Sequence, residues 1–144
     1  GRVLKIWTVV GAEESRTICE NLEVISLSFS PDGRTLALVG APILDNRGNL
    51  GAHTVCRWNT RDWKEIETPW VPPDVRSMAF RGDGRVLAVA WPGGMIRLLD
   101  PERGTELGVL SKLEADARLL AFSADGKLLV SVDANRNLRV WEQN

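Results

Sequence analysis

Three near-copies of one short segment are the feature that most constrains the fold of this chain. The copies read FSPDGRTLALVG from Phe29, FRGDGRVLAVAW from Phe80 and FSADGKLLVSVD from Phe122. The first two begin 51 residues apart and the last two 42 residues apart. Self-similarity at a period of roughly 40 residues is the signature of a repeat architecture, in which each unit buries its apolar faces against its neighbours.

A second marker follows each copy of the segment. Leu99 and Trp141 each come 19 residues after the Phe of their copy, whereas Trp58 comes 29 residues after Phe29. The first unit therefore carries about ten extra residues. We assign them to an insertion at 41–53, whose Pro, Asn and Gly residues predict a protruding hairpin or loop.

Within one unit, the residue pattern predicts four strands. Residues 24–30 (VISLSFS) alternate, with Ile25, Leu27 and Phe29 on one face. The Ser-Pro-Asp-Gly run that follows fits a type I turn, and the later copies keep its Asp-Gly pair. The next run, residues 35–40 (TLALVG), is apolar on both faces, so neighbouring elements must cover both of them. A strand rich in bulky residues and a short outer strand complete the unit.

A four-stranded sheet with two apolar faces must stack on copies of itself, and radial stacking produces a propeller. We therefore predict an all-β chain of β-propeller blades, each of four antiparallel strands. Residues 1–22 would supply outer strands of a preceding blade, 23–70 and 71–113 two complete blades, and 114–144 a partial blade.

This number of blades is too small for a ring, because propellers close with about four to eight blades. The prediction is a segment of a longer propeller. The alternative is an oligomer that completes the ring between chains.

The repeated segments resemble WD repeats, notably FSPDGRTLALVG with VCRWNT and FSADGKLLVSVDANRNLRVWEQN. The resemblance covers essentially the whole chain and implies a propeller that binds proteins. The usual Asp after the terminal Trp is replaced by Asn59 and Glu142, and Asp133 alone matches the tight-turn Asp. No His opens the first strand of a unit. The buried hydrogen-bond relay of the family is therefore expected to be mostly missing, and no functional residue tied to it is carried over.

Composition and residue types argue against several other classes of function. The net charge is −1, which disfavours a nucleic-acid or membrane surface. His53 is the single histidine, and Cys19 and Cys56 form no metal-binding motif. We predict no catalytic residues, no metal site and no cofactor.

Five of the six tryptophans divide into two groups. Trp7, Trp58 and Trp141 recur at one phase of the repeat and are predicted to pack in the core. Trp70 precedes VPPD in the link between blades, and Trp91 precedes PGG in a strand-to-strand turn. The WD resemblance implies that these connections and the insertion open on one face of the propeller.

We therefore predict a partner-binding patch of Trp70, Trp91 and Arg47 from the insertion. The alternative is that each tryptophan ring folds back and covers the end of its own blade. The predicted function is a non-catalytic scaffold or sensor that binds a protein or peptide. The alternatives are a regulatory propeller fused to a catalytic domain and an enzyme with a site in the central channel. Arg76 and Arg118, each four residues before a marker Phe, are the candidates for a channel site.

Overall fold

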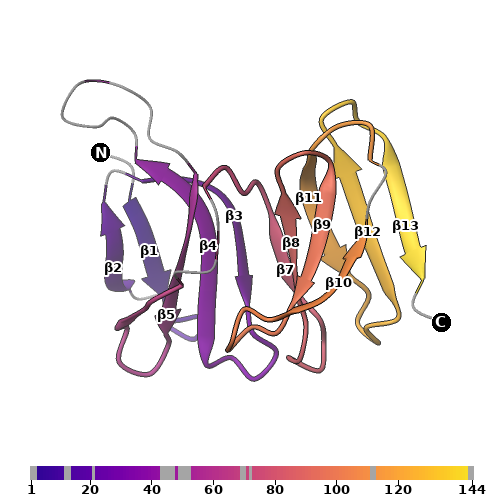
Figure 1. Ribbon diagram of the computed structural model, residues 1–144. Helices are drawn as coiled ribbons and strands as arrows, with labels where there is room; N and C mark the ends of the chain where they lie inside the picture. Colours follow the sequence, from indigo (N-terminus) through magenta and orange to yellow (C-terminus); the bar gives the residue numbers. More distant parts are fainter. Residues whose placement is uncertain are drawn as a thin grey trace.

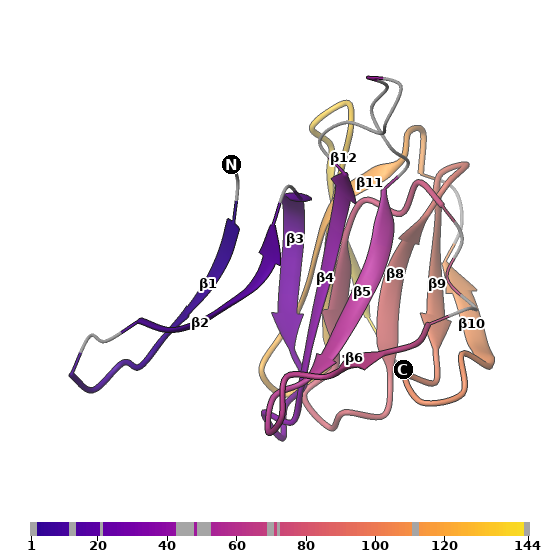
Figure 2. The same ribbon diagram turned by 90° about the vertical axis from the view of Figure 1, so that its left-hand side faces the viewer.

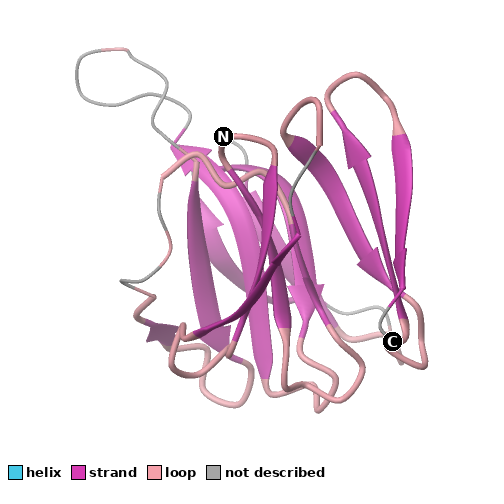
Figure 3. Cartoon of the chain, turned by 45° about the vertical axis from the view of Figure 1, so that its right-hand side comes forward, coloured by secondary structure: helices cyan, strands magenta, loops and turns pink. Residues whose placement is uncertain are grey.

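A computed structural model describes residues 3–11, 14–20, 22–42, 48, 53–68, 71, 73–110 and 113–142. The described residues form thirteen strands and contain no helix (Figure 3). The strands are β1 (Val3–Trp7), β2 (Glu14–Glu20), β3 (Leu22–Phe29), β4 (Thr35–Pro42), β5 (Thr54–Asn59), β6 (Glu65–Ile66), β7 (Met78–Phe80), β8 (Leu87–Trp91), β9 (Met95–Leu99), β10 (Glu106–Leu110), β11 (Ala117–Phe122), β12 (Leu128–Asp133) and β13 (Leu138–Glu142). The predicted all-β class is confirmed.

The strands make four antiparallel sheets that stand side by side along the chain (Figure 1). Their orders are β1-β2, β3-β4-β5-β6, β10-β9-β8-β7 and β11-β12-β13. The predicted four-stranded antiparallel sheets are thus present. Because β7 contacts both β3 and β11, these three strands line one side of the array.

The repeated Asp-Gly segments form the predicted turns. The N–H of Gly33 donates to the carbonyl of Ser30 at 2.8 Å, and equivalent bonds close the turns at Gly84 and Gly126. All three glycines have φ between 70° and 72°, a left-handed conformation that favours glycine. The Asp32 carboxylate accepts the backbone N–H of Arg34 at 2.9 Å, which completes the turn.

Two hydrophobic clusters fill the spaces between consecutive sheets. The first joins the β3–β6 sheet to the β7–β10 sheet and includes Val39, Val55 and Met78. The second joins the β7–β10 sheet to β11–β13 and includes Ile96 and Leu129. Strand β8 contributes to both clusters, since Val89 lies in the first and Ala88 and Ala90 in the second. The apolar run on both faces therefore reflects cover from both sides.

The marker tryptophans do not share one environment. Trp58 is 7 % exposed and Trp141 packs against the second cluster, as predicted. The prediction for Trp7 is wrong, because its ring is 55 % exposed. Among the described strands, β1 and β2 pair with each other alone, and Figure 2 shows this hairpin projecting away from the other sheets. A two-stranded sheet gives Trp7 too little neighbouring surface to cover it.

Apart from the β1–β2 hairpin, the first and the last of the three larger sheets both expose apolar side chains. On β3, Leu27 and Phe29 are each 52 % exposed. On the β11–β13 sheet, Leu119, Leu138 and Val140 include some of the most exposed large apolar side chains of the described strands. In soluble proteins a large exposed apolar patch often marks a surface that meets a partner.

Candidate partner-binding site

The turn between β8 and β9 holds the one predicted partner-binding residue that the structure describes. Strand β8 ends at Trp91, and β9 begins at Met95. Gly93 and Gly94 both have positive φ, 87° and 72°. A Cβ added to Gly94 would lie 2.7 Å from the carbonyl oxygen of Leu113, so a side chain there is excluded by space as well as by conformation.

The Asp116 carboxylate holds the β8–β9 turn through hydrogen bonds to its backbone. Its Oδ1 atom accepts the backbone N–H groups of Gly93 and Gly94, both at 2.8 Å. Two consecutive N–H groups that converge on one anion form a backbone nest. The nest ties the β8–β9 turn to the residue that immediately precedes β11.

The Trp91 ring is half-buried and held by an apolar and a cationic contact. It packs against the first hydrophobic cluster. The guanidinium carbon of Arg97 lies 4.3 Å from the ring centroid, within the range of a cation–π interaction. Arg97 is itself held by Glu106, with 2.7 Å between Nη1 and Oε2. The ring is therefore fixed in place while part of it remains accessible.

Trp70 and Arg47 lie outside the described residues. The structure does show that β4 ends and β5 begins at the same end of the array as the β8–β9 turn (Figure 1). The insertion between those strands therefore leaves the fold at the end that carries Trp91. The grouping of Trp70, Trp91 and Arg47 into one patch stays a prediction.

The two channel candidates lie together in one pocket at this end. Arg76 and Arg118 line a pocket of about 420 Å³ with Ile25, Asp116 and Ala134. The Nη1 atom of Arg76 lies 3.0 Å from the Nδ1 atom of His53. Burial, and next the Arg76 charge, lower the pKa of His53, which favours the neutral imidazole, the form that can accept this bond.

The residues around this pocket do not support nucleophilic catalysis or metal binding. A catalytic nucleophile needs a base within reach, and the pocket is lined by arginine, aspartate and aliphatic side chains. Among the described residues, no three His, Cys, Asp or Glu side chains lie close enough to hold a metal ion. Cys56 is a free thiol whose pKa is raised by burial, which makes it less reactive.

Comparison with known families decides the class of this chain. The family model of the anaphase-promoting complex subunit 4 WD40 domain matches residues 49–116. The family model of the WD domain, G-beta repeat, matches residues 116–142. The chain belongs to the WD-repeat family. WD-repeat domains serve in general as protein-interaction scaffolds. The described part contains no helix that is long and apolar enough to cross a membrane.

Part of the WD-repeat relay is present in the β11–β13 sheet, where the sequence pattern pointed to Asp133 but not to Ser131. The indole N–H of Trp141 donates to Oγ of the buried Ser131 at 3.0 Å. Asp133, also buried, accepts the backbone N–H groups of Asn135 and Asn137, both at 2.9 Å. The signal for Ser131 was its position as the one polar side chain inside the apolar run LLVSV.

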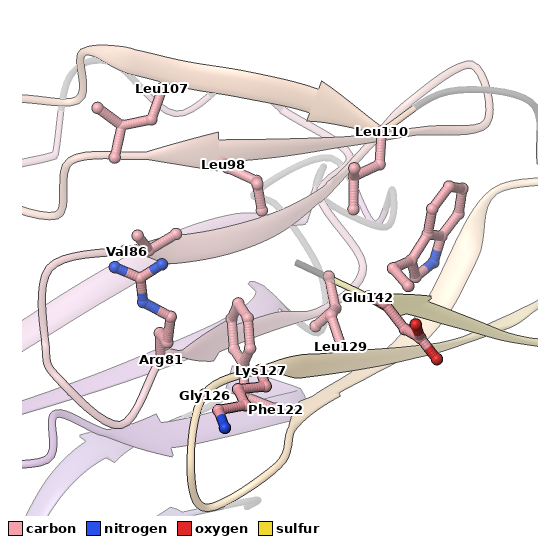
Figure 4. A pocket seen from close by; sticks show the side chains of 11 residues that line it. Arg81, Val86, Leu98, Leu107, Leu110, Phe122, Gly126, Lys127, Leu129 and Glu142 are labelled. Atoms are coloured by element: carbon pink, nitrogen blue, oxygen red, sulfur yellow. The ribbon is translucent and has the colours of Figure 1, made fainter. Parts of the chain in front are cut away.

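A second pocket lies between the β7–β10 sheet and the β11–β13 sheet. It measures about 320 Å³ and is lined mainly by apolar side chains, including Leu98, Leu110, Phe122 and Trp141 (Figure 4). In the preceding unit the position of Leu98 is taken by Arg57, which is buried and donates from Nη1 to the carbonyl of Pro101. The same place in the repeat is therefore polar in one inter-sheet contact and apolar in the next.

Proposed function

We propose that this chain is the partner-binding part of a non-catalytic WD-repeat scaffold or sensor. In this proposal the end of the array that carries Trp91 meets a protein or peptide, and Trp70 and Arg47 contribute to the same surface. The observation that carries the proposal is the half-buried Trp91 ring, held between the core and Arg97. Tryptophan is among the residues most enriched at interface hot spots.

The rigidity of the β8–β9 turn supports this choice of surface. Binding costs less free energy when the contacting side chain is already ordered in the free protein. The paired glycines, the Asp116 contact and the Arg97–Glu106 ion pair all restrict the position of Trp91 before any partner arrives. The net charge of −1 gives no general attraction to nucleic acid or to anionic membranes.

We further propose that the chain is one segment of a longer propeller, divided at 1–22, 23–70, 71–113 and 114–144. The remaining blades would come from the same polypeptide or from another chain. The apolar side chains exposed on β3 and on the β11–β13 sheet support this, since a neighbouring blade would cover them. The first matching family is named for a subunit of a multi-subunit complex, which agrees with a role in assembly.

Replacement of Trp91 by alanine tests the proposed surface. Peptides selected on the wild-type chain from a random phage-displayed library serve as ligands, and binding is measured by calorimetry. We expect Trp91→Ala to reduce the binding affinity for the selected peptides about 30-fold, equivalent to roughly 2 kcal/mol. Because the ring also packs on the core, we expect a loss of unfolding free energy of about 1–2 kcal/mol.

Trp63→Ala is the matched control. Trp63 is also a half-buried tryptophan in a turn, but it lies in the connection between β5 and β6. It should leave peptide affinity within about twofold of wild type, as for residues outside a hot spot. Equal affinity of the Trp91→Ala and Trp63→Ala variants for every selected peptide contradicts the proposal, even if Trp91→Ala is the less stable of the two.

A further inference from the structure

We propose that the pocket between Arg76 and Arg118 binds a carboxylate side chain of the partner protein. This inference rests on the proposed function and specifies the chemistry of the partner. The two arginines occupy the same position in successive repeats, four residues before Phe80 and Phe122. Because β7 and β11 are neighbours, the equivalent positions bring both side chains to one pocket.

Both guanidinium groups are available for an anion. Arg118 is exposed, and among the described residues no ion pair or hydrogen bond of its side chain is found. Arg76 contacts His53, a neutral imidazole, rather than a carboxylate. A partly buried arginine without a counter-ion gains more from a charged acceptor than from a neutral one. The pocket thus offers two cationic groups that the described side chains leave without an anionic partner.

The acidic groups nearby limit which anion fits. Asp116 lines the pocket, but its Oδ1 atom already accepts two backbone N–H groups. Asp74 and Glu23 act electrostatically on His53, so the surroundings are not uniformly basic. Among the residues that line the pocket, two arginines against Asp116 leave an excess of one positive charge, and Asp74 and Glu23 reduce that excess further. That excess suits a singly charged carboxylate better than a phosphate dianion, which would meet repulsion from Asp116.

The apolar part of the pocket favours a longer acidic residue. Ile25 is the third residue at this repeat position, and its side chain, 41 % exposed, lines the same pocket. The methylene groups of a glutamate can pack against it while the carboxylate reaches the arginines. A planar guanidinium can also donate two parallel hydrogen bonds to one carboxylate. We therefore expect a glutamate, flanked by aliphatic residues, as the recognised element.

The test uses two short peptides that differ in charge alone. An acetylated Leu-Glu-Glu-Leu amide and its Leu-Gln-Gln-Leu counterpart are titrated into the full chain, and the arginine Nε–Hε signals are followed by NMR. The acidic peptide should shift the signals of Arg76 and Arg118 and should bind at least about fivefold more tightly, as charge-assisted hydrogen bonds require. Inorganic phosphate is titrated separately.

Variants assign the effect to the pocket. Arg118→Gln, at an exposed position, should reduce the affinity for the acidic peptide by about fivefold without loss of folding. Arg118→Lys should recover part of it, because the charge remains but the bidentate geometry is lost. Arg103→Gln is the control, since Arg103 is an exposed arginine in the turn between β9 and β10.

The inference is overturned by no shift with the acidic peptide at millimolar concentration, by equal binding of both peptides, or by an unchanged affinity in Arg118→Gln. Tighter binding of inorganic phosphate than of the acidic peptide also overturns it. The proposed function fails separately, through the Trp91 variants. If Trp91-dependent binding persists while the acidic peptide does not bind, only the inference about the carboxylate is lost.

Discussion

Ser77 connects three consecutive sheets through a single hydroxyl group. Its side chain is 2 % exposed, and its Oγ atom accepts the backbone N–H of Leu120 at 3.1 Å. The hydroxyl of Ser26 on β3 lies 3.4 Å away. Ser77→Ala would leave the Leu120 N–H buried without an acceptor. We expect the free energy of unfolding to fall by about 1–3 kcal/mol, the cost of an unsatisfied buried donor, in urea denaturation.

Ser28→Ala provides the comparison for this prediction. The Ser28 hydroxyl makes one long, exposed contact of 3.5 Å to a neighbouring carbonyl. Its removal should change the unfolding free energy by less than about 0.5 kcal/mol. Equal effects of the two substitutions would show that Ser77 does not link the sheets in solution.

Arg57 is a buried charge at a place where the next repeat uses Leu98. It is 3 % exposed, its pKa is lowered by burial, and its Nε atom is buried without a hydrogen-bond partner. Replacing a buried charge by an apolar residue of similar volume is often neutral or stabilising. We expect Arg57→Met to leave the unfolding free energy unchanged or to raise it by about 1 kcal/mol.

Truncation of Arg57 to alanine should instead lower the free energy of unfolding. Arg57→Ala removes the packing of the long side chain and leaves a cavity, so we expect a loss of about 2–4 kcal/mol. Thermal unfolding of both variants measures the difference. A large destabilisation by Arg57→Met would mean that the bond to Pro101 stabilises the contact between the first two complete sheets.

At the scale of the element, the Asp-Gly turns repeat one electrostatic arrangement. The Ser30 hydroxyl donates to Asp32 at 2.6 Å, and the Ser123 hydroxyl donates to Asp125 at 2.6 Å. These bonds, followed by a backbone N–H, lower the pKa of both carboxyls below 3.8. In the Phe80 copy the Arg81 guanidinium takes the place of the hydroxyl and lowers the pKa of Asp83.

This arrangement predicts a loss of stability in acid. Because the folded pKa values are depressed, the unfolded chain binds more protons at pH values between them and 3.8. The stabilisation is complete above pH 3.8 and disappears as the pH falls through the folded values. Carboxyl NMR titration should place Asp32 and Asp125 below 3.8, and Ser30→Ala should raise the pKa of Asp32 alone. Ordinary pKa values for both carboxyls would contradict the turn geometry.

The sequence could predict the turns and strands because their causes are local. Asp-Gly pairs set the turn conformation, and runs that are apolar on both faces, such as β8, report cover by two neighbours. The failure at Trp7 has a non-local cause: its phase in the repeat is right, but the described hairpin lacks the neighbouring strands that would bury it. Repeat phase identifies the position of a residue in a blade, not whether the rest of that blade is present.

The candidate site was predictable to a smaller extent. The Pro-Gly-Gly sequence places Trp91 at a turn, but the contacts of its ring with Arg97 and of its turn with Asp116 depend on side chains from other strands. Ser77 shows the same limit, because its partners lie 51 and 43 residues away in the sequence. Repeat phase did align Arg76 with Arg118, and the pocket that they share follows from that alignment.

At the scale of the whole molecule, the first and the last of the three larger sheets both expose apolar side chains. The β3–β6 sheet exposes Leu27 and Phe29, and the β11–β13 sheet exposes Leu138 and Val140. Interior strands of the array, by contrast, are covered on both faces. A propeller segment is expected to show this distribution, because each blade supplies the surface that its neighbours bury.

Sedimentation velocity over a concentration series is the most direct test of the central claim that this chain is a segment of a larger propeller. We predict concentration-dependent association of the isolated chain, because association would bury the apolar side chains exposed on β3 and on the β11–β13 sheet. A double variant, Leu27→Lys with Val140→Lys, should reduce the association without changing the strand content by circular dichroism. A wild-type chain that stays monomeric at every concentration and unfolds in one cooperative transition would contradict the claim.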